Sequence, residues 1–244
     1  MQAIKRNHQN LKKAYETIRR KTYEAVGSSK YSRPSLNDID RKLEKYLHYE
    51  NGVFIEVGGN DGFTQSNTYY LEKFKGWQGI LVEGIPQLYH QCVRERKESK
   101  VFNYALVSDD FKDSHITMHY ADLRSFAEGA MKTKDEVKNN IKTWIRNQKQ
   151  YRKRSVASYK IKIPTRTLTS ILDECQVKEI DFFSLDVEGY ELNVLKGLDF
   201  KRYRPKYMLI EARYKEEVEE YISDLYVQID RLSHHDFLYK SKAI

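Results

Sequence analysis

The sequence predicts an α/β protein with a Rossmann-like, doubly wound sheet. Short apolar runs alternate with amphipathic segments of helical length from about residue 50 onward. The first run, residues 53–57, leads into a glycine-rich turn and a predicted helix, as in the first βα unit of a cofactor-binding sheet. Residues 225–240 look like two short strands around a turn. These observations favour a mostly parallel sheet with an antiparallel hairpin at its C-terminal edge.

The first 50 residues predict a helical extension. Residues 4–26 form a basic amphipathic pattern, so we expect a helix that packs on the domain or on a partner copy in a homodimer. Attachment to a membrane surface is the weaker alternative. The apolar positions of this helix are Ile4, Leu11, Ala14, Tyr15 and Ile18. Ser35 and Asp38 have the spacing of a capping box for a second helix that ends near Leu47.

The rest of the chain predicts seven strands with helices on both faces of one sheet. We expect strands at residues 53–57, 79–83, 101–107, 180–185, 207–211, 225–232 and 236–240. We expect helices at residues 66–75, 86–97, 167–175, 190–197 and 215–225. Pro86 at a first helical position, and Gly76 and Gly197 just past helix ends, support these boundaries. No linker divides residues 1–244, so a single domain is expected.

The charge of the chain is concentrated in one segment. The formal net charge is +8, and residues 132–162 alone carry eleven basic and two acidic side chains. Cys92 and Cys175 are far apart and form no metal-binding motif, which favours a reducing compartment. The N-terminus shows no signal peptide, and no apolar run is long enough to cross a bilayer. We therefore expect a soluble cytoplasmic protein, and contact with a membrane surface stays open.

The glycine-rich turn predicts which cofactor it binds. Glu56 and Asp61 flank it without a Lys or Arg, and Asn60 stands where a dinucleotide site needs its second glycine. These features favour S-adenosylmethionine, whose sulfonium and ammonium are positive and whose carboxylate can bind the amides of a helix start. Glu83 ends the next strand about 20 residues past Gly62, the spacing of a ribose-hydroxyl acceptor. The alternative is that these acids only cap helices or end strands.

Several motifs along the chain resemble the FkbM-type family of S-adenosylmethionine-dependent methyltransferases. The matching segments are residues 54–62, 66–68, 71–72, 79–83, 103–107, 163–164, 167–168 and 181–191. The most specific is residues 181–191, which looks like the family's D-x-E-G-x-E signature, although Ser184 stands where family members often carry Lys. The resemblance implies a class I methyltransferase fold with S-adenosylmethionine as cofactor.

The carboxyl ends of the parallel strands should meet at one edge of the sheet and form the site. The cofactor-binding candidates are Glu56, Gly58, Asn60, Asp61, Gly62, Ser66, Asn67, Glu83, Leu106, Val107 and Asp186. The catalytic candidates are Asp186, Glu188, Glu211 and His234. We expect Asp186 to touch cofactor and acceptor, with Glu188 or Glu211 as base or substrate anchor. A divalent ion such as Mg²⁺ on Asp186 and Glu211 stays open, because carboxylates can also act alone.

The acceptor is the least determined feature. The family resemblance favours a sugar hydroxyl on a glycan, nucleotide sugar or glycolipid. Residues 121–158 interrupt the path from the third to the fourth strand and are expected to form a basic acceptor lid, in which Trp144, Tyr151 and Tyr159 stand among positive charges. Such a surface also suits nucleic acid, so an RNA methyltransferase is the alternative. A solvated helix face, and a non-catalytic scaffold that keeps the fold, also remain open.

Overall fold

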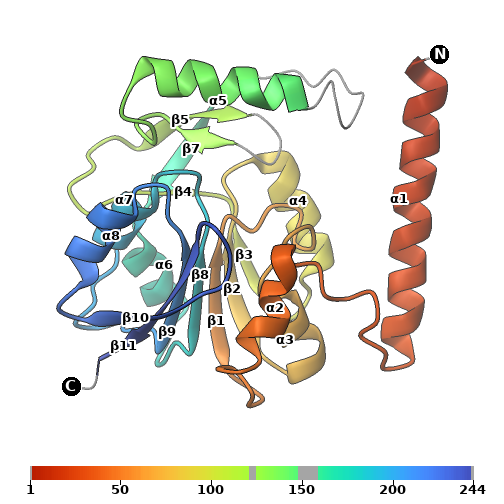
Figure 1. Ribbon diagram of the computed structural model, residues 1–244, viewed down its shortest axis with the longest axis horizontal. Helices are drawn as coiled ribbons and strands as arrows, with labels where there is room; N and C mark the ends of the chain where they lie inside the picture. The colour runs from red at the N-terminus through yellow and green to blue at the C-terminus, as the bar shows by residue number, and fades with distance from the viewer. Residues whose placement is uncertain (1, 121–124, 148–158, 243–244) are drawn as a thin grey trace.

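The structure is a computed structural model that describes residues 2–120, 125–147 and 159–242 of the chain, without the side chains of residues 2–10, 134, 140–141 and 144–147. Its main sheet has seven strands in the order β10-β11-β9-β8-β1-β2-β3 (Figure 1). The strands are β1 (Val53–Val57), β2 (Gln78–Val82), β3 (Lys100–Phe102), β8 (Phe182–Leu185), β9 (Tyr207–Glu211), β10 (Tyr226–Arg231) and β11 (Asp236–Ser241). The first five of these form parallel pairs, while β11 runs antiparallel to β9 and to β10. The predicted class I methyltransferase fold and its C-terminal hairpin are thus confirmed.

Helices cover both faces of the main sheet because successive strand residues point to opposite sides. Phe54 packs in one cluster with Leu71 and Cys92, on the face covered by α2 (Ile39–Leu43), α3 (Tyr69–Lys75) and α4 (Pro86–Glu95). Its neighbour Ile55 packs in the other cluster, with Leu168 and Val218. The helices on that second face are α6 (Leu168–Glu174), α7 (Glu191–Lys196) and α8 (Lys215–Ile222). The carboxyl ends of the parallel strands stay uncovered by these helices.

A second sheet, in the order β4-β7-β5-β6, was not predicted. Its strands are β4 (Ala105–Leu106), β5 (His115–Tyr120), β6 (Phe126–Ala127) and β7 (Tyr159–Arg166). The strand expected over residues 101–107 is therefore divided between the two sheets. The division falls at Asn103, whose side-chain amide donates to the carbonyls of Glu83 and Gly84 (both 2.8 Å) instead of continuing the ladder.

The basic insertion contains one described helix, α5 (Lys134–Asn147), which lies over β5 and β7 at the top of the view (Figure 1). The segments 121–124 and 148–158 lie outside the described residues, as do four of the predicted basic side chains, Lys149, Arg152, Lys153 and Arg154, and the aromatic Tyr151. The prediction of an acceptor lid over residues 121–158 therefore stays a proposal.

The N-terminal extension begins with helix α1 (Gln2–Ala25), as predicted, but the expected capping box is wrong. Asn37 and Asp38 adopt left-handed backbone angles (φ 54° each), so a 3₁₀ turn (Leu36–Asp38) precedes α2, which ends at Leu43. The hydroxyl of Ser35 makes no cap and donates instead to the side-chain oxygen of Asn67. Among the helices in the described part of the chain, none combines the length and apolar character that a membrane crossing requires.

Candidate active site

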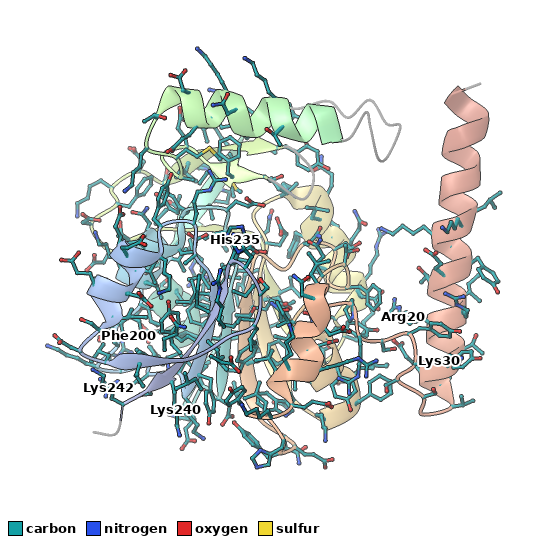
Figure 2. The ribbon with its side chains drawn as sticks, in the orientation of Figure 1. Arg20, Lys30, Phe200, His235, Lys240 and Lys242 are labelled. Atoms are coloured by element: carbon teal, nitrogen blue, oxygen red, sulfur yellow. The ribbon has the colours of Figure 1, made fainter. Side chains whose placement is uncertain are left out.

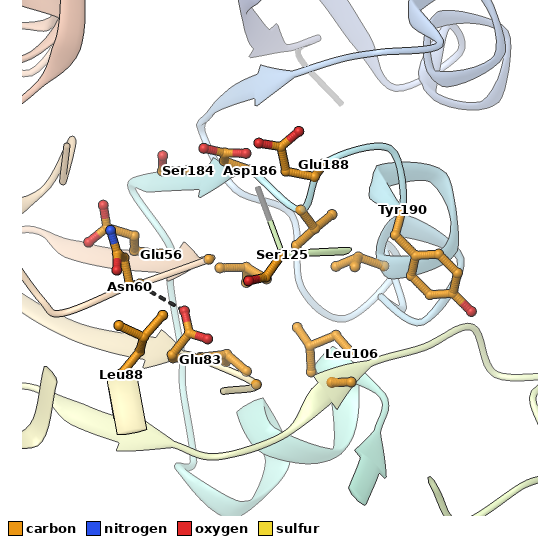
Figure 3. A pocket seen from close by; sticks show the side chains of 18 of the residues that line it. Glu56, Asn60, Glu83, Leu88, Leu106, Ser125, Ser184, Asp186, Glu188 and Tyr190 are labelled. Carbon is orange, nitrogen blue, oxygen red and sulfur yellow. Dashed lines mark hydrogen bonds between the residues drawn. The ribbon is translucent and has the colours of Figure 1, made fainter. Parts of the chain in front are cut away.

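The carboxyl ends of β1, β2, β4 and β8 border one pocket (Figure 3). The cleft holds about 1010 Å³ of empty space, counted out to open solvent. The predicted site residues that line it are Glu56, Gly58, Asn60, Ser66, Asn67, Glu83, Leu106, Asp186 and Glu188. Those that do not line it are Asp61, Gly62, Val107, Glu211 and His234. The structure thus brings most of the candidates together, while their roles stay predictions.

Glu56, at the end of β1, is buried within a closed set of hydrogen bonds. Its carboxylate accepts the Ser66 hydroxyl (2.9 and 3.0 Å), the Asn67 amide (2.9 Å) and the Thr68 hydroxyl (2.6 Å). It also forms an ion pair with Arg96 (3.0 Å). Glu56 therefore fixes the loop between β1 and α3, and its charge is already balanced within the protein.

Arg96 is the residue that the sequence interpretation missed. Its guanidinium is fully buried and also pairs with Glu72 (2.8 Å) and donates to the Thr68 hydroxyl (2.8 Å). It stands within the charged run at residues 94–98, which looks like a solvated helix end. No local signal distinguishes a buried Arg in such a run, because the partners of Arg96 lie on β1 and α3.

The backbone amides at the start of α3 are also engaged. The Thr68 and Tyr69 amides donate to the Ser66 hydroxyl (3.2 and 3.0 Å), and the Asn67 amide donates to Glu56. The sequence had suggested such amides as donors to the cofactor's carboxylate, but here side chains of the same loop satisfy them.

Asp61 likewise serves its own loop. It accepts the Phe63 and Thr64 amides (3.1 and 2.7 Å) and pairs with Lys13 of α1 (3.1 Å). Burial acts to raise the pKa of Asp61, but these amides and Lys13 outweigh it, so the pKa lies below its ordinary value. This ionised side chain holds the turn beside the pocket without lining it.

Glu83, at the end of β2, lines the pocket with fewer partners. One carboxylate oxygen accepts the Asn60 amide (2.8 Å, dashed in Figure 3), and the other accepts the Ile85 amide (2.7 Å). Burial raises the pKa of Glu83 to about 7, although hydrogen bonds from the Ile85, Asn60 and Gly84 amides oppose the rise. A carboxylate offers about four lone-pair sites, so one stays open to a further hydrogen bond.

Gly58 lets the ends of β1 and β8 approach each other closely. Its φ is +90°, and a Cβ at this position would lie 2.0 Å from the Asp186 carbonyl oxygen. Any other residue would push Asp186 away from the first turn. The glycine thus places Asp186 on the same pocket as Glu56 and Asn60.

Asp186 stands among other acids. Burial raises the pKa of Asp186 well above its ordinary value, and the negative charges of Glu211 and Glu188, together with a hydrogen bond shared with Glu211, add to the rise. In the same turn, burial raises the pKa of Glu191 to about 7. Figure 3 shows Asp186 and Glu188 side by side, across the pocket from Glu83. A carboxylate with a raised pKa in a cleft suits general-base chemistry.

The metal prediction gains no support from this geometry. Asp186 and Glu211 meet, but no group of three or more His, Cys, Asp or Glu side chains among the described residues is arranged to hold a metal ion. We therefore do not propose Mg²⁺ at this site.

The start of the basic insertion packs against the edge of the site. The Tyr214 hydroxyl, just past β9, donates to Glu136 (2.9 Å), and Lys132 pairs with Glu217. Gly189, in the turn after Asp186, lies so close to the Ala130 carbonyl that a Cβ there would approach it to 2.7 Å. These contacts connect the insertion to the turn that carries Asp186.

The histidines lie away from the pocket lining. His234 is in the turn between β10 and β11, where its ring nitrogen lies 3.0 Å from the Arg231 guanidinium. His119 stacks on Phe126 in the second sheet (ring centroids 4.9 Å apart). His115 and His119 are both on strand β5.

The comparisons with known proteins decide the family. The description "Methyltransferase FkbM domain" matches residues 56–239, which is more than half of the chain. The chain belongs to the FkbM methyltransferase family. This confirms the resemblance seen in the sequence, and it identifies the protein as a methyltransferase. Comparison with curated proteins found no match.

Solved structures that are similar to this FkbM methyltransferase match it at low identity. One is an S-adenosylmethionine-dependent methyltransferase from Aquifex aeolicus, 15% identical, with a TM-score of 0.44 over 86% of this chain and 92% of that one. Another is a TehB-like S-adenosylmethionine-dependent methyltransferase from Corynebacterium glutamicum, 10% identical, with a TM-score of 0.41 over 99% and 100%. A third is fibrillarin from Aeropyrum pernix, 15% identical, with a TM-score of 0.37 over 84% and 76%. Similarity at such low sequence identity gives no information about the substrate.

Proposed function

We propose that this FkbM methyltransferase transfers a methyl group from S-adenosylmethionine to a hydroxyl of a sugar, on a glycan, nucleotide sugar or glycolipid. One observation carries the proposal. A single pocket at the carboxyl edge of the sheet joins Glu83, which has free acceptor capacity, to Asp186, whose surroundings favour proton uptake. The first group suits the ribose of an adenosyl cofactor, and the second suits an acceptor hydroxyl.

The residues present fit the adenosyl part of the cofactor. The Glu83 carboxylate can accept a ribose hydroxyl while it keeps its bonds to the Asn60 and Ile85 amides. Leu88 and Leu106 line the pocket beside it (Figure 3) and offer an apolar surface to the adenine ring. The positive end of the cofactor would face the acids of the opposite side, Asp186 and Glu188. Glu56 contributes indirectly, since its network with Arg96 shapes the loop.

The methyl transfer then depends on the alignment of the acceptor oxygen and on the removal of its proton. When bound, S-adenosylmethionine supplies an electrophilic methyl group on a sulfonium. The pocket residues hold the acceptor oxygen in line with that methyl group. Asp186 accepts the hydroxyl proton, and Glu211, which shares a hydrogen bond with it, keeps the base oriented. A base with a raised pKa matches a hydroxyl better than an ordinary aspartate does.

The mouth of the pocket suits a sugar. Glu188 lines the pocket beside Asp186, and a carboxylate binds sugar hydroxyls, whereas the neighbouring Tyr190 is buried in the core. Residues 130–136 pack on the same edge through Tyr214, which supports the proposed role of the insertion as a lid. Cys92 and Cys175 are free thiols, which supports a reducing compartment such as the cytoplasm.

Two measurements test this function. Calorimetry should detect binding of S-adenosylhomocysteine and no binding of NADH. Incubation of the purified protein with S-adenosylmethionine and a panel of sugars, nucleotide sugars and glycolipids should add the mass of one methyl group to one class. Binding of the cofactor product together with methylation of RNA alone would replace the sugar assignment and keep the methyltransferase.

RNA is the second candidate because the described part of the basic segment 132–162 is rich in exposed cations. Lys138 and Lys142 on α5, and Lys160 and Lys162 on β7, are all exposed. A basic surface of this kind binds phosphates with an affinity that falls steeply as salt rises. Methylation of RNA that disappears as salt is raised would favour this candidate, whereas turnover on a neutral sugar that is insensitive to moderate salt would exclude it.

A further inference from the structure

Helix α1 turns its polar face toward the body of the protein. Arg20 is only 3% exposed; it pairs with Glu95 of α4 (2.8 Å) and with Glu24 (3.2 Å), and it donates to the Tyr69 hydroxyl. Figure 2 shows Arg20 between α1 and the rest of the molecule. About two helical turns before Arg20, Lys13 forms an ion pair with Asp61 of the glycine-rich loop. The helix is thus held to the body by ion pairs.

The opposite face of α1 is apolar and uncovered. Leu11, Tyr15 and Ile18 are 63%, 62% and 66% exposed. Their spacing of four and three residues places them in one stripe along the helix. A helix at a protein surface normally buries its apolar stripe and exposes its charges. Here the orientation is reversed, so folding of the chain alone does not account for the stripe.

Positive charges border the stripe on both sides. At 100° per residue, Lys12 and Arg19 lie along one edge and Lys21 lies along the other. Arg19 also stacks over the ring of Tyr15 (5.6 Å). Over Gln2–Ala25 the sequence contains seven Lys and Arg against two Glu. An apolar stripe between cationic edges is the pattern of helices that lie in the interface of a membrane.

We propose that α1 docks this protein on an anionic lipid bilayer, with Leu11, Tyr15 and Ile18 entering the acyl boundary and Lys12 and Arg19 meeting the phosphates. Lys21, on the other edge, already pairs with Glu95 (2.8 Å). The ion pairs of Arg20 and Lys13 lie on the side away from the bilayer, so they are kept when the protein binds. The rest of the protein then lies on the aqueous side of α1.

Charge favours the bilayer over the other occupants of this face. A second copy of the chain would bring the same cationic edges against each other, whereas anionic headgroups neutralise them. RNA would neutralise the cations but would leave the apolar stripe in water, which costs free energy. Of these three occupants, the anionic bilayer is the one that satisfies both the stripe and its edges.

Vesicle flotation with the full chain tests the proposal. The protein should float with vesicles of phosphatidylcholine mixed with phosphatidylglycerol and should not float with phosphatidylcholine alone. Ile18→Asp should weaken binding to the mixed vesicles about tenfold or more, because an apolar anchor is replaced by an acid. Lys12→Gln should weaken it about fivefold. Val93→Asp is the matched control, since it makes the same exchange on the exposed side of another helix, α4, and should bind like the wild type.

Calorimetry with S-adenosylhomocysteine on each variant shows whether the fold is kept, and sedimentation shows the oligomeric state. Failure of the wild type to float with the mixed vesicles would overturn the proposal. So would a wild-type dimer that Ile18→Asp converts to monomers without any change in flotation, since a second copy would then cover the stripe. Equal losses from Ile18→Asp and Val93→Asp would show that net charge alone drives the binding, which also contradicts the proposal.

Discussion

The two sides of the pocket both carry acids, but the groups that the structure places around these acids differ. On the β1 side, Glu56 pairs with the buried Arg96, and its oxygens accept hydrogen bonds from the loop before α3. On the β8 side, Asp186 lies against Glu211 and Glu188, and its pKa rises as a result of burial and these negative charges. An acid that is paired with a cation can have a structural role. Acids that lie close together raise one another's pKa, so they can take up and release a proton.

The largest effect expected from this comparison is on turnover. Asp186→Asn should lower kcat by about 10³-fold, because the base is lost while the shape is kept. Asp181→Asn is the matched control: it lies in the same signature segment, but it binds the Val53 amide (2.8 Å) at the other end of the strand. Single-turnover kinetics on the two variants checks this. Turnover of Asp186→Asn within a few-fold of the wild type would remove the base assignment.

The next effect is on stability and belongs to the β1 side. Arg96→Gln should lower the free energy of unfolding by about 4 kcal/mol, since Glu56 and Glu72 would remain buried without their cation. Arg202→Gln, which breaks an exposed pair with Asp173, should change the free energy of unfolding far less, because solvent screens such a pair. Denaturant unfolding measures both. A small loss at Arg96 would mean that the acids on this side do not need their partner.

The β8 side of the pocket can also be tested through Glu191, by the pH dependence of the protein's stability. Its pKa in the folded protein is about 7, against 4.5 for an unperturbed Glu, so folding favours its protonated form. This contribution is present below about pH 4.5 and is lost as the pH rises to about 7. The side chain in Glu191→Gln stays neutral. Between about pH 5 and pH 8, the free energy of unfolding of this variant should therefore rise by about 2 kcal/mol relative to that of the wild type. Unfolding curves at both pH values check this, with exposed Glu179→Gln as the control. A difference that is constant with pH would contradict the prediction.

The smallest expected effect tests whether Glu211 raises the pKa of Asp186. Because Glu211 raises the pKa of Asp186, Glu211→Gln should let the base lose its proton at lower pH. The acidic limb of kcat/KM should then move down by about one pH unit. A pH–rate profile measures the shift, and a limb that stays in place or moves up would show that Glu211 does not act on the base.

The sequence predicted the fold because the signals involved are local. Alternating apolar runs, Pro86 at a helix start and Gly76 past a helix end specify elements without knowledge of their neighbours. The same reasoning placed Glu56, Glu83 and Asp186 at strand ends, and strand ends at one edge share a pocket. The capping box at Ser35 failed because the hydroxyl found a distant partner, Asn67.

By itself, therefore, the sequence determined the order of strands and helices, the family signature and the edge at which the acids meet. Only the tertiary structure decided which groups surround those acids: Arg96 is 40 residues from Glu56, and Asp186 meets Glu211 on the neighbouring strand. It also decided that α1 turns Arg20 inward and Ile18 outward. The physical reason is that periodicity is a property of neighbouring residues, whereas the charge state of a side chain depends on every group that folding brings around it.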